Sequence, residues 1–257
     1  MQDLKRSEWV NLDYDGWLKL FKENDKHRLF IDENSPATLT KEEKNLISKS
    51  IVAFQRGEHS EGTSLRKSAE AFSKKYNEKR YPMVIDYFIK EENFHSKYLA
   101  TFMRIEGIPI ETKNFMDIIF RRIRKFNGIK SEVITLVTAE IIALTYYQVL
   151  GAATSSVVLK RICNQMLHDE LPHIVFQSYT ISHFKQSKLL KIKRRLLMEI
   201  TTVSVYLAFY RFFKKNSCSF AFFRKENIGY LNQSKDIIRY MNDLYNNREG
   251  SIENKAK

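Results

Sequence analysis

Glycine, proline and cysteine are scarce in this chain of 257 residues, which contains 8 Gly, 4 Pro and 2 Cys. So few glycines and prolines favour long helices, and no segment shows the alternating apolar pattern of a β-strand. Two cysteines without a CxxC motif exclude a disulfide scaffold and favour a reducing compartment. We therefore expect an all-α, cytoplasmic protein.

Long hydrophobic runs are also missing. The first six residues, MQDLKR, lack the apolar core of a secretory signal. The most apolar late stretch, residues 200–213, is too short to span a bilayer comfortably. These two observations predict a chain without a transmembrane segment.

Acidic residues are outnumbered, with 30 Asp and Glu against 43 Lys and Arg, for a net charge of +13. The excess is concentrated in residues 182–257, which carry 16 Lys and Arg against 6 Asp and Glu. Such a surface attracts nucleic acid, anionic lipid or an acidic carrier protein, although a solvated lysine-rich surface is the simpler interpretation. No RNA-binding motif is visible, so nucleic acid is a weakly supported partner.

The chain does contain a series of amphipathic helical patterns. We expect an N-terminal arm over residues 1–38, a bundle over 39–185, and basic C-terminal helices over 186–257 packed on the bundle. A capping box formed by Thr40 and Glu43 marks the start of the first long helix, which we expect to continue to Phe72. Further predicted helices cover residues 81–107, 115–126, 131–151, 157–177, 188–214 and 232–247.

Glutamate and histidine interrupt the apolar helix faces in a repeated order. They are Glu61, Glu92, His95, Glu140, Glu170 and His173. Glu61 precedes the first Glu-x-x-His pair by 31 residues, and Glu140 precedes the second by 30. That separation equals one helix, a turn and part of the returning antiparallel helix, so the members of each half reach a similar height. The pattern predicts one site built from four helices.

The residue types at this site favour two metal ions. Residues three apart share a helix face, so each Glu-x-x-His pair can bind one ion. Four carboxylates balance two divalent ions, whereas without metal they would repel one another and suffer desolvation. Oxygen-rich ligands with one imidazole per metal suit iron or manganese.

Three further residues near this pattern have open roles. Glu58 lies three residues before Glu61 on the same face and is the alternative first ligand. Tyr147 follows Glu140 by two turns, either as a hydrogen-bond donor to a ligand or as a core tyrosine. Asp169 is a candidate partner that orients a ligand histidine.

The segments EENFH at residues 91–95 and DELPH at 169–173 resemble the EExxH and DExxH helices of soluble acyl-carrier-protein desaturases and related di-iron oxidases. The resemblance covers roughly residues 40–180. It implies a ferritin-like four-helix bundle that binds two iron ions, with Mn/Fe or Mn as alternatives. By this resemblance Glu92 and Glu170 bridge the metals, Glu61 and Glu140 are terminal ligands, and His95 and His173 each bind one metal.

The resemblance implies an O2-dependent oxidase or oxygenase whose catalytic group is the di-metal centre itself. We expect an apolar small-molecule or carrier-bound substrate, an electron donor and a homodimer. A ferroxidase or iron-handling protein is one alternative, although mineral nucleation needs an acidic surface and this chain is basic. The other is a non-enzymatic or redox-silent bundle that binds nucleic acid, a membrane or a partner through its basic C-terminal part. A related variant is a tRNA-modifying di-iron hydroxylase that holds RNA on the basic surface.

Overall fold

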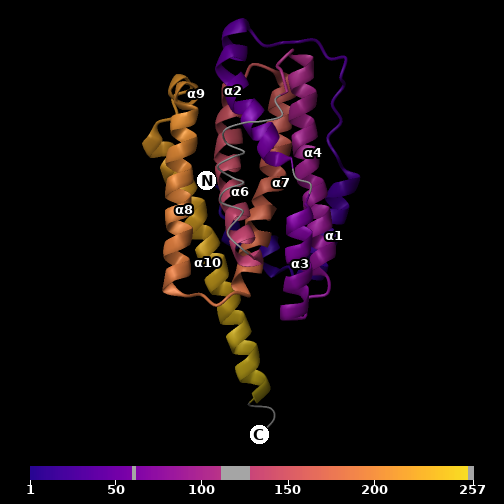
Figure 1. Ribbon diagram of the computed structural model, residues 1–257, viewed down its shortest axis with the longest axis vertical. Coiled ribbons are helices and arrows are strands. Elements are labelled where there is room, and N and C mark those ends of the chain that lie inside the picture. Colours follow the sequence, from indigo (N-terminus) through magenta and orange to yellow (C-terminus); the bar gives the residue numbers. More distant parts are fainter. Residues whose placement is uncertain (60–61, 111–127, 254–257) are drawn as a thin grey trace.

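The protein, described here by a computed structural model over residues 1–59, 62–110 and 128–253, is helical throughout its regular elements in those ranges. The helices are α1 (Tyr14–Lys26), α2 (Lys41–Glu58), α3 (Thr63–Tyr76), α4 (Tyr81–Ile105), α6 (Ile129–Ala153), α7 (Val157–Ser182), α8 (Lys188–Ala208), α9 (Tyr210–Lys215) and α10 (Phe220–Glu253). α2, α4, α6 and α7 form the central bundle, and the other helices surround it (Figure 1). The predicted all-α bundle with additional helices is confirmed. The helix predicted over 115–126 lies outside the described residues.

Local sequence signals explain where the bundle helices begin and end. The Thr40 side chain caps α2 by accepting a hydrogen bond from the backbone N–H of Glu43. The Glu43 carboxylate, however, accepts hydrogen bonds from Thr154 and Ser155 in the loop between α6 and α7. This contact ties the start of α2 to the opposite helix pair.

The sequence predicted one continuous helix over residues 40–72, and this prediction is wrong. α2 ends at Glu58, and α3 begins at Thr63 after Gly62, which has φ of +71°. A Cβ at position 62 would lie 2.6 Å from a side-chain carbon of Ile89, so a side chain there is excluded by both backbone and space. α3 therefore starts a new direction and packs against α4 and α6.

α6 is the most apolar helix of the bundle. In the described part of the chain it is the one helix long and apolar enough to cross a membrane, but 83% of its most apolar window is buried inside the protein. It packs along α7 and also contacts α8 and α10. Burial on all sides accounts for its composition as that of a central core helix.

The predicted N-terminal arm consists of two short 3-10 helices, Leu4–Arg6 and Glu8–Asn11, followed by α1. Trp17 is fully buried, and α1 packs against α4. The backbone N–H of Leu4 donates to Gln233 Oε1 at 2.6 Å, which joins the arm to α10. The arm therefore contacts both the bundle and the last helix.

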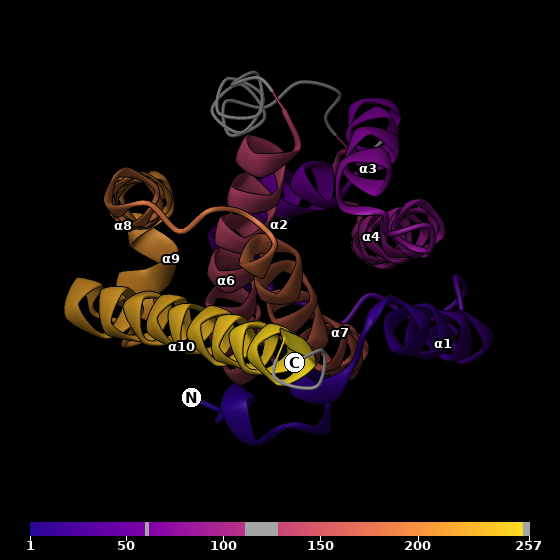
Figure 2. The ribbon, with the colours of Figure 1, turned by 90° about the horizontal axis from the view of Figure 1, so that it is seen from below.

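The C-terminal region differs from prediction in two places. The helix predicted over 188–214 is interrupted between α8 and α9. α10 begins at Phe220 rather than at Asn232, because Phe223 and Tyr230 in the earlier part are buried and continue the helix's apolar face. α10 packs against α6, α7 and α8, so this region covers one side of the bundle (Figure 2).

Candidate metal centre

Buried carboxylates and histidines from four helices meet at the centre of the bundle. They are Glu58 from α2, Glu92 and His95 from α4, Glu140 from α6, and Glu170 and His173 from α7. Each Glu-x-x-His pair lies on one helix face, as its spacing predicts. These residues form a cluster able to hold metal ions.

The cluster divides into two overlapping groups, in each of which the ligand atoms lie within 4.8 Å of one another. The groups are Glu58, Glu92, His95 and Glu170, and Glu92, Glu140, Glu170 and His173. Each group holds one histidine and one carboxylate of its own. Glu92 and Glu170 belong to both groups, which is the arrangement expected of carboxylates shared by two metal ions.

Glu170 faces both histidines at equal distances. Its Oε1 lies 3.4 Å from His95 Nδ1, and its Oε2 lies 3.4 Å from His173 Nδ1. Glu92 Oε1 lies 3.7 Å and 3.2 Å from the same two nitrogens. Ligands that each lie about 2 Å from one metal ion are separated by distances of this order.

The atoms that face the centre of the cluster have no hydrogen-bond partner among the described residues. These atoms are both carboxylate oxygens of Glu170, Oε1 of Glu92, and Nδ1 of His95 and His173. Buried polar atoms are almost always paired, so several orphans pointing at one place require an explanation. Metal ions would pair all of them, and the donor set of carboxylates with imidazoles fits that role.

Burial and neighbouring charges shift the pKa values of the cluster carboxyls in different directions. Burial raises the pKa of Glu58 well above its ordinary value, and the charges of Glu92 and Glu170 raise it further. Burial and the same two charges raise the pKa of Glu140. Burial alone would raise the pKa of Glu170 too, but contacts with Glu140 and the two histidines outweigh burial and lower it.

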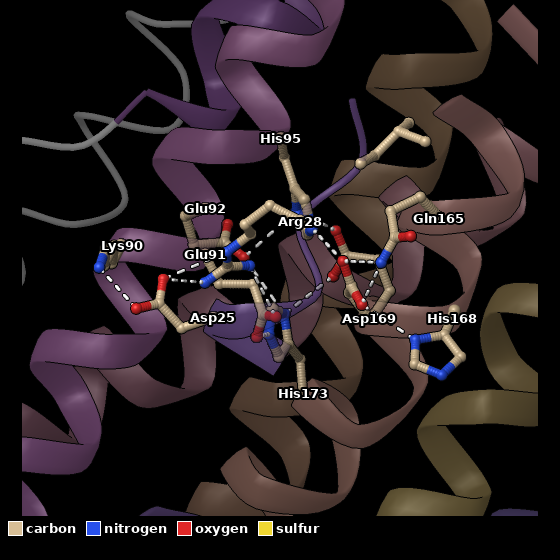
Figure 3. A network of polar contacts seen from close by, with 12 residues as sticks. Asp25, Arg28, Lys90, Glu91, Glu92, His95, Gln165, His168, Asp169 and His173 are labelled. Atoms are coloured by element: carbon tan, nitrogen blue, oxygen red, sulfur yellow. Dashed lines mark hydrogen bonds and ion pairs between the residues drawn. The ribbon is translucent and has the colours of Figure 1, made fainter. Parts of the chain in front are cut away.

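A carboxylate on the opposite helix orients each histidine. His95 of α4 places Nε2 3.1 Å from Asp169 Oδ2 of α7, and His173 of α7 places Nε2 3.0 Å from Glu91 Oε2 of α4 (Figure 3). These contacts leave both Nδ1 atoms for the centre and favour one ring orientation. The predicted role of Asp169 matches this placement. Glu91 is the first residue of the EENFH segment, and the sequence pattern predicted no role for it.

The N-terminal segment supplies the cation that balances Glu91. The Arg28 side chain, 13% exposed, donates from Nη1 to Glu91 Oε1 at 3.0 Å. Asp25 accepts from Arg28 at 3.2 Å and from Lys90 at 2.6 Å (Figure 3). Sequence reasoning left Arg28 and Asp25 unplaced. Glu91 next to the inward Glu92 could have indicated a nearby cation, because a second buried carboxylate requires one.

Arg28→Met is expected to destabilise the protein by about 3 kcal/mol, because it leaves Glu91 buried without its cation. We also expect roughly tenfold weaker metal binding, since His173 loses a fixed partner. Urea unfolding and metal titration measure the two effects. The matched control is Arg104→Met, which removes an exposed pair with Glu33 and should change neither quantity appreciably. Equal behaviour of the two variants would contradict the positioning role.

Glu58, the alternative first ligand, belongs to the cluster. Its Oε1 accepts a hydrogen bond of 2.5 Å from the hydroxyl of Tyr147, which is fully buried. Tyr147 thus contacts a cluster carboxylate, one of the two roles left open by the sequence. Glu61 lies outside the described residues, so its role as the first ligand stays a prediction.

A small cavity of about 70 Å³ adjoins the cluster between α2 and α6. Glu58, Glu92 and Glu140 are the charged members of its lining. The remaining lining residues are mostly small or apolar: Ala53, Phe54, Gly57, Thr135, Leu136, Ala139, Ile142, Ala143 and Phe209. The volume exceeds several times what one water molecule needs. Small molecules can therefore reach the carboxylate side of the cluster, whereas the histidines lie away from this cavity.

Fold alone does not define function, so the chemistry of the site itself has to be argued. Comparison with protein-family models, with curated proteins and with solved structures finds no match for this chain.

Proposed function

We propose that this protein is an O2-dependent di-iron oxidase or oxygenase that acts on an apolar substrate. The observation that carries the proposal is the cavity beside the cluster, where the charged residues among the described lining are all cluster carboxylates. A cluster that only stored or structurally bound metal would gain nothing from an apolar cavity at its ligands. An oxidising centre needs one, because it must admit O2 and hold an apolar group while limiting water.

Two iron ions bound by the cluster would supply the electron-transfer chemistry with O2, as carboxylate-rich sites with one imidazole per metal do. The chain's own residues hold the ligand side chains together and orient them. Glu92 and Glu170 keep the two ligand groups together, and Asp169 and Glu91 fix the histidine rings. The Tyr147 hydroxyl holds the Glu58 carboxylate in place through its hydrogen bond.

The electron balance of the proposed reaction requires a second donor. O2 takes up four electrons, two from the substrate and two from an external reductant. One oxygen atom enters the substrate and the other leaves as water, or both leave as water when the substrate is dehydrogenated. The proposal therefore includes an electron-donor partner that supplies the two electrons of the external reductant.

The cavity lining favours a small or narrow apolar group at the cluster. Ala53, Gly57, Ala139 and Ala143 supply small surfaces there. None of the described residues that line the cavity is basic, so a substrate held by an anionic group next to the metals is disfavoured. The net charge of +13 also disfavours iron storage, since a basic chain attracts neither iron ions nor mineral nuclei.

Titration with Fe(II) under anaerobic conditions, followed by O2, tests the proposal. We expect rapid oxidation of about two irons per chain and no more, with continued O2 uptake only when a reductant is supplied. Continued oxidation of many irons per chain would instead identify a ferroxidase. Absence of any O2 reaction in the iron-loaded protein would contradict both functions.

Substitutions at Gly57 separate the cavity from metal binding. Gly57 lies in α2 and lines the cavity. A Cβ at this position would meet no atom within 4 Å beyond its chain neighbours and the backbone of its own helix. Gly57→Ala should stabilise α2 by about 1 kcal/mol. Gly57→Leu should fill the cavity and slow O2 uptake roughly tenfold, with unchanged iron content. Unchanged O2 uptake in the leucine variant would exclude this cavity as the reaction space.

A further inference from the structure

α8 exposes a continuous apolar stripe along the face that points away from the bundle. Its residues are Leu189, Ile192, Leu196, Ile200, Val203 and Leu207, which are between 40% and 67% exposed. Their spacing of three and four residues places all six on one face of the helix. Single exposed apolar residues are ordinary, but a stripe over the whole length of a helix marks an interaction surface.

The opposite face of α8 is already used. Leu190, Met198, Thr202 and Val205 are buried there, and the helix packs against α6 and α10. In both ribbon views α8 stands at the periphery, with α6 and α10 on its inner side (Figures 1 and 2). α8 therefore already contributes one face to the core of the protein, and the stripe is a second apolar face that the core does not use.

Positive charge surrounds the stripe. Residues 182–225 contain eleven Lys or Arg and one acidic residue, Glu199. Glu199 is itself paired, with Arg195 at 2.8 Å and Arg224 at 2.6 Å. Lys188 and Lys193 are exposed on α8. Most of the chain's excess charge is thus carried by α8 and the segments that adjoin it in the sequence.

Aromatic side chains extend this surface beyond α8. Tyr210 at the start of α9 is 44% exposed, and Phe222 near the start of α10 is 48% exposed. Lys214 lies 5.4 Å from the ring centroid of Tyr210. Aliphatic residues in the centre with lysine, arginine and aromatic residues at the margins are typical of a helix that lies in a lipid interface.

We propose that the α8 stripe and its basic margin form a docking surface for an anionic lipid membrane, on which the protein lies without crossing it. A second copy of the chain fits this surface poorly, because two such faces would bring like charges together. RNA fits poorly as well, because aliphatic side chains offer neither stacking platforms nor hydrogen bonds to bases. Anionic lipid complements both the apolar stripe and the charge.

Co-sedimentation of the full chain with vesicles tests the proposal. The vesicles are phosphatidylcholine alone, or phosphatidylcholine with about one third phosphatidylglycerol. We expect binding to the anionic vesicles, and at least roughly tenfold weaker binding to the neutral ones. The triple variant Ile192→Ser, Leu196→Ser, Ile200→Ser should lose about tenfold or more in affinity for anionic vesicles.

Charge-reversal variants on α8 and on α3 separate a specific effect of the α8 surface from a general effect of net charge. Lys188→Glu with Lys193→Glu should weaken binding by about tenfold, whereas Lys67→Glu with Lys74→Glu on α3 should not. These lysines are all exposed, and α3 lies on the other side of the bundle (Figure 2). Phe30→Ser, which removes a side chain 78% exposed, controls for lost apolar surface.

Equal binding to both kinds of vesicle, or equal binding by the stripe variant and the wild type, would overturn the proposal. Failure to bind anionic vesicles, together with self-association that the stripe substitutions abolish, would overturn it in favour of a dimer interface. Failure to bind vesicles together with salt-sensitive RNA binding would overturn it in favour of RNA. None of these measurements requires bound metal or a substrate, so they are independent of the proposed oxidase function.

Discussion

Glu170→Gln is expected to abolish stable binding of both metal ions. The Glu170 carboxylate is shared by the two ligand groups, with one oxygen 3.4 Å from His95 Nδ1 and the other 3.4 Å from His173 Nδ1. An amide carries no charge and keeps one oxygen, so each group loses one of its two shared carboxylates. Metal analysis after anaerobic loading with Fe(II) and desalting should fall from about two ions per chain to nearly none.

Two companion variants make this result specific. Glu132→Gln alters another buried carboxylate of α6, which pairs with Ser64 and belongs to neither group, so metal content should be unchanged. Glu140→Gln alters a ligand of one group only and should leave about one ion per chain. Two ions per chain in the Glu170→Gln protein would refute the shared-ligand assignment.

Metal binding is expected to release protons, and its affinity should rise with pH. Burial first, and then neighbouring carboxylates, raise the pKa of Glu58 and Glu140, which favours the protonated form of both groups before metal binds. Burial would lower the pKa of His95 and His173, but their contacts with carboxylates outweigh it and raise both values. Each of the four groups must lose its proton to become a ligand.

The direction of the pH effect follows from this balance. Protons compete with metal at raised-pKa groups, so affinity falls as pH decreases and grows as pH increases. Calorimetry with Mn(II), a redox-stable probe, in buffers of different ionisation enthalpy counts the released protons. Glu58→Gln should reduce the count by about one. Heats independent of the buffer, or affinity independent of pH, would contradict the assigned protonation.

The bundle and most of the cluster could be predicted because their signals are local. Glu92 with His95, and Glu170 with His173, lie three apart, and helical geometry alone puts each pair on one face. The interval of about 30 residues then relates each pair to a carboxylate on a neighbouring helix. No long-range information was needed to expect these side chains in one place.

The rest depended on contacts that sequence spacing does not encode. The break between α2 and α3 arises where Gly62 approaches Ile89 of α4, and this break leaves Glu58 as the last residue of α2. Arg28 reaches Glu91 across 63 positions of the sequence from a segment without a regular pattern. Such partners are set by tertiary packing. In the sequence, the one sign of them is a second glutamate, Glu91, directly before Glu92.

The crosswise contacts of the histidines also decide how two helices align. His95 of α4 is held by Asp169 of α7, and His173 of α7 is held by Glu91 of α4. A slip of one helix along the other by a single turn, about 5.4 Å, would separate both pairs at once. Apolar contacts are not directional, so they define the alignment of neighbouring helices less sharply than these polar pairs do. The polar pairs therefore fix the alignment of α4 with α7, and the same alignment brings Glu92, His95, Glu170 and His173 together.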